Sequence, residues 1–168
     1  SAQVYAGLSE ARHTFDVRAR DGSGNVDLTP ATHSWTVDVT PPDTSIVSAP
    51  PNPTSSRDAS ISIGATEPGV SLECKLDGGP FSVCTSPKLY TSLAEGPHTV
   101  QARATDAAGN VDPTPATSSG TIDATFPTTT IDAGPNGPTN DPNATFTFSS
   151  SDPGAVFECQ FDGSPYAP

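Results

Sequence analysis

The sequence predicts an all-β protein built from tandem antiparallel β-sandwich repeats with an 85-residue period. Two observations lead to this fold class: the chain repeats itself at a fixed offset, and its apolar residues alternate with polar ones between frequent turns. Cys74 and Cys159 lie 85 positions apart (159 − 74), and the same offset relates further identical residues: Tyr5 and Tyr90, His13 and His98, Asn25 and Asn110, Asp38 and Asp123, and Asp77 and Asp162. A period far above that of a solenoid indicates tandem copies of one small domain.

The repeat divides the 168 residues into one whole unit and two halves. Residues 42–126 make a complete unit, residues 1–41 match its C-terminal half, and residues 127–168 match its N-terminal half. We therefore expect a window from a longer array, whose half-units are completed by chain outside the window or by a neighbouring subunit.

The composition favours strands over helices. The chain has 19 prolines, 14 glycines and no methionine, and no stretch shows apolar residues at helical spacing over about ten residues. The hydrophobic content of 33% is low, yet the alternation suits thin sandwiches better than disorder. No segment approaches the length of a transmembrane helix, so we expect no membrane insertion in this window.

The complete unit begins with a strand at 44–47, and a proline-rich stretch then forbids regular pairing until Ala59. From Ala59 onward, apolar residues alternate with serines, which indicates a half-buried strand. After a turn at 67–69, the next inward-facing row consists of Val70, Leu72, Cys74 and Leu76.

A hairpin turn at 77–80 then returns the chain to Cys84. Phe81 and Val83 cannot share a face with Cys84 unless a bulge intervenes, which leaves the register open. Further strands are expected at 88–91, at 98–105 and up to residue 123, so the unit has about seven strands, as a sandwich does. The expected core consists of Ala59, Ile61, Ile63, Leu72, Leu76, Val100, Ala102, Ala104 and Ile122, with Gln101 and Arg103 facing outward.

The cysteines fit one disulfide per repeat. Cys74 and Cys84 flank the hairpin turn, and cysteines across a hairpin can reach the separation that a disulfide requires. The partner of Cys159 is expected at the counterpart of Cys84, just beyond the window. We therefore expect a bridge between Cys74 and Cys84 and an extracellular or cell-surface location, with reduced core thiols as the alternative. A zinc site is disfavoured because no second cysteine or histidine pair accompanies these residues.

The net charge of −12, from seven basic and 19 acidic residues, restricts the partners. Nucleic acid and anionic membranes bind basic patches, so we expect neither as a partner. Catalysis is not expected either. His13 and His98 are the same position in two copies, and no repeated serine, histidine and carboxylate arrangement accompanies them. We predict that the chain is not an enzyme.

One part of the repeat resembles a known family. Residues 93–100 (LAEGPHTV) and 104–110 (ATDAAGN) are similar to the E–F corner and F–G turn of bacterial immunoglobulin-like and fibronectin type III-like tandem repeats. Those repeats are common in large secreted or cell-surface proteins, so the resemblance implies an immunoglobulin-like sandwich in that setting. His98 stands where fibronectin-like domains carry a corner tyrosine, and its ring N–H could donate to a nearby backbone carbonyl.

Two acidic turns are the candidate metal sites. One contains Asp106, Asn110 and Asp112, and its twin contains Asp21, Asn25 and Asp27. Three oxygen-bearing side chains in a tight loop are what Ca²⁺ needs, and backbone carbonyls could add ligands. The favoured alternative is an ordinary hairpin, in which Asp caps the turn and Gly or Asn takes positive φ.

The topology implied by the resemblance would gather acidic residues at a domain junction. The F–G loop would lie at the same end as the B–C loop, which carries Glu67, and as the linker, which carries Asp38 and Asp43. Such carboxylates repel one another unless a cation relieves them or they splay into water. The calcium hypothesis therefore combines the loop at 106–112 with Asp43 or Glu67.

The linkers predict the mechanics of the array. Residues 39–43 and 124–128 are short and contain proline, so neighbouring domains should adopt a limited range of orientations. We predict structural repeats of an extracellular or cell-surface protein, which form a semi-rigid stalk, adhesin body or filament. The partners would be neighbouring repeats and, in a filament, other copies. The alternative is a ligand- or carbohydrate-binding module of an adhesin or secreted enzyme, although the short loops carry few exposed aromatic residues.

Overall fold

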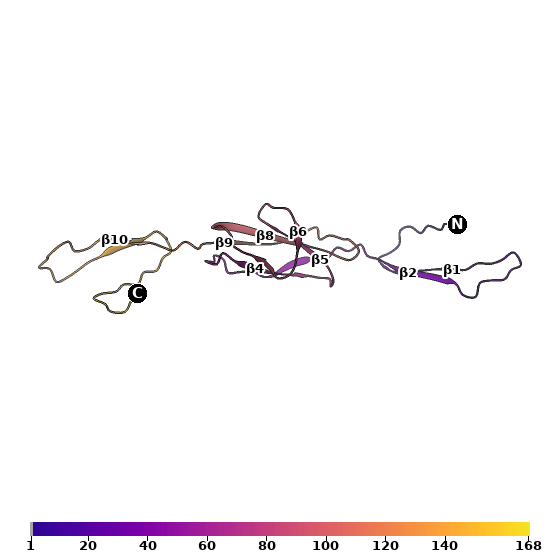
Figure 1. Ribbon diagram of the computed structural model, residues 1–168, viewed down its shortest axis with the longest axis horizontal. Coiled ribbons are helices and arrows are strands. Elements are labelled where there is room, and N and C mark those ends of the chain that lie inside the picture. Colours follow the sequence, from indigo (N-terminus) through magenta and orange to yellow (C-terminus); the bar gives the residue numbers. More distant parts are fainter. Residues whose placement is uncertain (1) are drawn as a thin grey trace. The chain divides into compact units, whose positions relative to one another are not determined.

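The computed structural model describes residues 2–168, and these residues form strands, turns and loops without a helix (Figure 1). No helix that could cross a membrane occurs in this part of the chain. The chain divides into two compact units, Ser1–Asp123 and Ala124–Pro168. The prediction of an all-β, antiparallel architecture is confirmed.

The first unit contains an isolated hairpin followed by a larger set of strands. The hairpin consists of β1 (Ala11–Val17) and β2 (Ala31–Val37), which pair antiparallel with Ala11 opposite Val37. The other strands are β3 (Thr44–Ser48), β4 (Ala59–Ala65), β5 (Ser71–Leu76), β6 (Ser82–Cys84), β7 (Lys88–Tyr90), β8 (Gly96–Thr105) and β9 (Ala116–Ile122).

These strands form two antiparallel sheets that are consistent with a β-sandwich. The order is β3-β4-β7 in one sheet and β6-β5-β8-β9 in the other. Ile61 and Ile63 of β4 form a buried cluster with Cys74 of β5 and with Val100 and Ala102 of β8. Because alternate residues of each strand face the other sheet, this cluster joins the two sheets.

The predicted core agrees closely with the buried positions. Ala102 and Ala104 are fully buried, whereas Gln101 and Arg103, which alternate with them along β8, keep part of their surface in solvent. Leu72 and Leu76 were expected to be buried, but they are half-buried and pack against the core cluster. The other expected core positions are buried: Ala59, Ile61, Ile63, Val100 and Ile122.

The β5–β6 hairpin needs no bulge to place its cysteines. Leu72 lies opposite Cys84 and Glu73 lies opposite Val83, so Cys84 faces inward and Val83 faces outward. Val83 is accordingly 82% exposed. Cys74 and Cys84 form the expected disulfide, with a Cα–Cα distance of 5.8 Å. The bridge runs diagonally across the hairpin because Cys74 itself lies opposite Ser82.

The second unit has a smaller set of strands. Strand β10 (Thr129–Ala133) pairs antiparallel with β11 (Thr147–Ser150). Several apolar side chains remain exposed in this unit, among them Phe146 at 49% and Phe148 at 38%. Cys159 is free and exposed. The unit therefore carries an apolar surface that its own strands do not cover.

Candidate functional site

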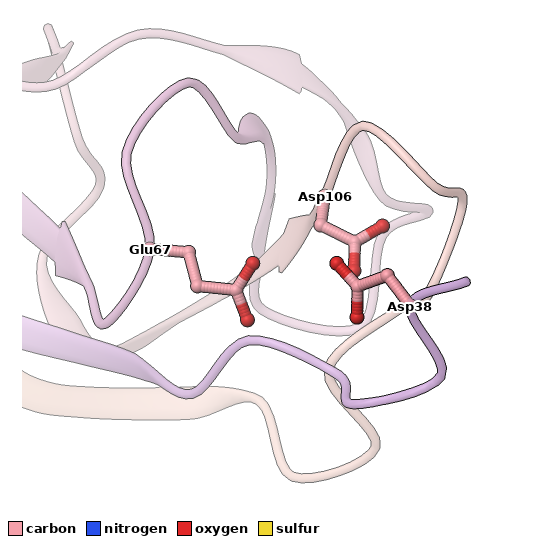
Figure 2. Close-up of side chains that lie close together, drawn as sticks. All are labelled: Asp38, Glu67 and Asp106. Atoms are coloured by element: carbon pink, nitrogen blue, oxygen red, sulfur yellow. The ribbon is translucent and has the colours of Figure 1, made fainter. Parts of the chain in front are cut away.

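Three carboxylates converge at the junction between the β1–β2 hairpin and the sandwich (Figure 2). Asp38 follows β2, Glu67 lies in the turn between β4 and β5, and Asp106 follows β8. One carboxylate oxygen from each residue lies within 4.8 Å of the others, and all three residues are half-buried. Segments far apart in the sequence thus place negative charge at one point.

The backbone of the turn after β8 fixes the position of Asp106. Its Oδ1 accepts hydrogen bonds from the backbone N–H groups of Gly109 (2.7 Å) and Asn110 (2.8 Å). Its Oδ2 accepts a bond from the Asn110 side-chain amide at 2.8 Å. Desolvation raises the pKa of Asp106, but the hydrogen bonds from Asn110 and Gly109 outweigh it, so the pKa lies below its ordinary value. The turn therefore holds this carboxyl group in its ionised form.

The turn after β1 has the same construction. Asp21 Oδ1 accepts from the N–H groups of Ser23 (2.9 Å) and Asn25 (2.8 Å), and its Oδ2 accepts from the Asn25 amide at 2.8 Å. The Asn25 side chain makes the largest contribution to a lowered pKa of Asp21. Among residues 2–168 no further carboxylates join Asp21 in a metal-sized group. The Asp–Asn pair therefore forms this turn even where, as at Asp21, the turn does not belong to an acidic cluster.

Glu67 has the opposite electrostatic response. Desolvation raises the pKa of its carboxyl group, and the negative charges of Asp38, Asp106 and Glu10 raise it further. The cluster therefore contains one carboxylate that the turn stabilises as an anion and one that its neighbours destabilise. A bound cation or a proton on Glu67 would relieve this repulsion.

The structure places the remaining candidate ligands elsewhere. Asp112 is 2% exposed; its Oδ2 accepts from the Thr44 N–H (3.0 Å), and its Oδ1 accepts from the N–H and hydroxyl of Thr114. Its oxygens therefore join the loop to β3. Asp43 is exposed and takes part only through its backbone, which pairs with Thr66. Asp27 repeats part of the Asp112 arrangement by accepting from Thr29.

Asn110 contributes a donor to the junction. Its side-chain amide donates to the backbone oxygen of Asp38 at 3.1 Å as well as to Asp106. Asp38, rather than Asp43, is the linker residue that completes the acidic cluster. The residues after β2 are thus hydrogen-bonded to the turn after β8.

A histidine corner lies at the start of β8. The Nε2 atom of His98 lies 3.0 Å from the backbone oxygen of Ala94, and its Nδ1 lies 3.0 Å from Asp77 Oδ2. Both ring nitrogens face acceptors, so only the protonated ring donates to both. The Ala94 carbonyl, followed by the Asp77 carboxylate, raises the pKa of His98. The expected bond from the ring to a backbone carbonyl is present.

Known proteins add no constraint on these sites. No family model matches the chain, and no curated protein matches it. The junction, the histidine corner and the uncovered apolar surfaces are therefore the features from which a function can be inferred.

Proposed function

We propose that the chain belongs to a tandem array of immunoglobulin-like sandwiches that serves as a semi-rigid stalk, adhesin body or filament of an extracellular or cell-surface protein. The observation that carries the proposal is the anchored linker. The Asn110 amide binds the Asp38 carbonyl, Pro42 is fully buried, and the backbone oxygen of Asp43 accepts from the Thr66 N–H at 3.0 Å. A linker held at several points cannot act as a flexible tether.

Corresponding elements support the repeat. Strand β2 begins at Ala31 and β9 at Ala116, and β3 begins at Thr44 and β10 at Thr129. Each pair is displaced by the 85-residue offset of the sequence (116 − 31 and 129 − 44). The division into a sheet of three strands and a sheet of four supports the immunoglobulin-like arrangement.

The disulfide supports the extracellular setting. Cys74 and Cys84 are bonded within one small sandwich, and disulfides persist in oxidising compartments. A thin core gains a larger share of its stability from such a bridge than a large core does.

Scattering from arrays of different length tests the proposed role. Arrays with increasing numbers of residues 42–126 joined in frame should show a maximum dimension that grows in proportion to copy number. A compact particle whose maximum dimension stays constant would contradict the stalk.

A substitution in the linker anchor tests the stiffness directly. Asn110→Ala removes the donor to Asp38 and should lower the steady-state fluorescence anisotropy of Trp35, the single tryptophan, because the hairpin then moves more freely. Asn25→Ala is the matched control, since Asn25 makes the same bonds to its own turn aspartate. Equal anisotropy in both variants would contradict an anchored linker.

A carbohydrate-binding role is the second candidate. It is favoured by a shallow hollow of about 370 Å³ on the β1–β2 hairpin. The lining residues are Gln3, Tyr5, Leu8, Phe15, His33 and Trp35. Aromatic rings beside polar groups can stack on sugars, and a saturable change in Trp35 fluorescence on titration with oligosaccharides would support this role.

A further inference from the structure

We propose that the pair Asn136–Gly137 is a site of spontaneous modification, at which the Asn136 side chain loses ammonia and becomes aspartate or isoaspartate. The pair lies in the loop between β10 and β11, which spans residues 134–146. The inference goes beyond the proposed function and does not depend on the role as a stalk. It follows from the two residues themselves and from the freedom that the fold leaves them.

The reaction needs only these two residues and water. The backbone nitrogen of Gly137 attacks Cγ of Asn136, so an N–Cγ bond forms and the Cγ–Nδ2 bond breaks. Nδ2 leaves as ammonia and takes the proton of the Gly137 N–H. The product is a cyclic imide, a succinimide. Water then opens the ring at Cγ, which gives aspartate, or at the main-chain carbonyl carbon, which gives isoaspartate. No oxidant or reductant takes part.

Gly137 favours the closure of this ring. A glycine obstructs the attack least, because it has no side chain beside the attacking nitrogen. Gly137 has a φ of 75°, which glycine adopts without strain, and no heavy atom beyond its chain neighbours lies within 4 Å of the place that a Cβ would occupy. Asn136 is the only asparagine in the sequence that is followed by glycine. Both the chemistry of the neighbour and the space around it therefore permit the attack.

The fold restrains neither reacting group. Asn136 and Gly137 are both exposed, and residues 134–146 contain no strand. Within residues 2–168, no hydrogen bond holds the Asn136 side chain or the Gly137 N–H. The two groups can therefore meet through rotation of a loop segment, which opens at a lower cost than a paired strand does.

The corresponding place lies on the surface of the complete sandwich as well. Asn136 and Gly137 match Pro51 and Asn52 (136 − 85 and 137 − 85), and both counterparts are exposed. Asn52 Oδ1 accepts the Thr121 N–H at 2.9 Å, which ties that loop to β9. Gly137 has no side chain that could make such a bond. The position is thus open to water in a repeat of this kind, and the exchange of asparagine for glycine removes its side-chain anchor.

The two turn asparagines are protected by the fold. The side-chain amides of Asn25 and Asn110 donate to Asp21 and Asp106, each at 2.8 Å. A valine follows each of them, and its branched side chain crowds the backbone nitrogen that would attack. Ring closure there would break the bonds that form the turn. These two residues therefore provide internal references for the rate at Asn136.

The other three asparagines lack at least one of the conditions that Asn136 meets. Asn52 is followed by a proline, which has no N–H and cannot close the ring. The N–H that follows Asn140 donates to Thr139 Oγ1 at 3.1 Å. The amide of Asn143 donates to a neighbouring aspartate at 3.0 Å. We therefore expect the modification at Asn136 alone in the folded protein.

The modification changes both the charge and the backbone of the loop. The formal net charge of −12 becomes more negative by one. In the isoaspartate form, the main chain runs through the former side chain and is longer by one carbon. Ala133 and Thr147, which close the β10–β11 ladder, lie outside the modified pair. We therefore expect the two strands to remain paired while the loop between them lengthens.

Peptide mapping of the full 168-residue chain by mass spectrometry tests the proposal. The protein is incubated, folded and in urea, at a mildly alkaline pH, where the attacking nitrogen loses its proton more readily. Asn136 should convert equally fast in both samples, because the fold does not restrain it. A folded protein in which Asn136 converts several-fold more slowly than in urea overturns the proposal. Conversion of Asn25 or Asn110 as fast as that of Asn136 in the folded protein also overturns it.

The products and three variants identify the site and the route. Opening of a succinimide must give isoaspartate beside aspartate, whereas direct hydrolysis gives aspartate alone, so aspartate as the only product overturns the route. Asn136→Gln should abolish the acidic form and Gly137→Ala should slow its appearance, whereas Asn140→Gln, the control in the same loop, should leave the rate unchanged. An acidic form that persists in Asn136→Gln overturns the site.

Other residues do not confuse this reading. The Asp–Gly pairs at 21–22, 77–78 and 162–163 can isomerise through the same ring, but they do so without a change in mass. The outcome is also separate from that of the proposed function. Scattering from arrays of residues 42–126 measures a length, and these residues do not include Asn136, so either proposal can fail while the other holds.

Discussion

At the scale of the residue, His98 shows how one side chain joins two loops. Its ring lies between the Ala94 carbonyl and the Asp77 carboxylate, and Asp77 Oδ1 also accepts from the Thr99 N–H at 2.8 Å. The pKa of His98 is raised, chiefly by Ala94, and the pKa of Asp77 is lowered, chiefly by the Thr99 bond. Both shifts favour the charged pair in the folded protein.

The corner predicts a pH-dependent stability. Because the pKa of His98 is raised in the folded protein, its contribution to the free energy of unfolding is complete below the pKa of the unfolded chain, about 6.5. This contribution is lost as the pH rises through the pKa of the folded protein. The free energy of unfolding, measured by urea titration, should therefore fall between pH of about 6 and 8. His98→Gln should flatten this slope. His33→Gln is the control, because its counterpart is Ser118 and it lies outside the corner; an equal loss of slope there would contradict the assignment.

Asp112 carries a structural prediction. Asp112→Ala removes the acceptor of the Thr44 N–H and of Thr114 at a buried position, so we expect the free energy of unfolding to fall by about 2–3 kcal/mol. Asp43→Ala removes an exposed carboxylate from the neighbouring linker and should change it by less than about 0.5 kcal/mol. Denaturant titrations of the oxidised proteins measure both. Similar values for the two variants would argue against Asp112 as the tie between β3 and the loop.

At the scale of the element, the strands could be predicted because alternation in the sequence follows the alternation of faces in a strand. The β5–β6 hairpin shows the limit. Its apolar Phe81 faces outward because its ring lies 4.9 Å from Lys75 Nζ and 4.3 Å from the guanidinium of Arg103. Arg103 belongs to a strand paired by a long-range contact, so this cation–π arrangement has no local signal.

The disulfide gives a prediction for the same hairpin. Replacing both Cys74 and Cys84 by alanine should lower the free energy of unfolding by about 3 kcal/mol, because the bridge restricts the unfolded chain. Cys159→Ala leaves the bridge intact and should have little effect. Urea titration compares the two variants. A double variant as stable as the wild type would show that the core alone holds this sandwich together.

At the scale of the whole molecule, the location of the acidic cluster could be predicted from the sequence, but the residues that form it could not. The chain order placed Glu67, the linker and the loop after β8 at one end. Asp112 appeared equivalent to Asp106 in the sequence, yet it is bound to Thr44, a residue 68 positions away. Asp38 joins the cluster instead of Asp43 because the Asn110 amide holds its backbone. Hydrogen bonds between distant segments decide such choices, and local spacing does not encode them.

The junction carries the last prediction, in which calcium binding remains a hypothesis. The pKa of Glu67 is raised by desolvation and by its acidic neighbours, so stability is greatest with Glu67 protonated and is lost as the pH rises through its folded-state pKa. Glu67→Gln should therefore raise the melting temperature of the chelator-treated protein at neutral pH, and the gain should vanish below a pH of about 4, where the carboxyl group is protonated.

If calcium binds, it should raise the melting temperature of the wild type and not that of Glu67→Gln, because a ligand stabilises only the state that binds it. Asp43→Asn, an equal change of charge outside the cluster, should keep the calcium response. Identical melting of the wild type in calcium and in chelator would leave the Asp106 loop as a turn and no more, and the stiffness of this junction would then rest on the Asn110 bond to Asp38, the buried Pro42 and the backbone bond between Asp43 and Thr66.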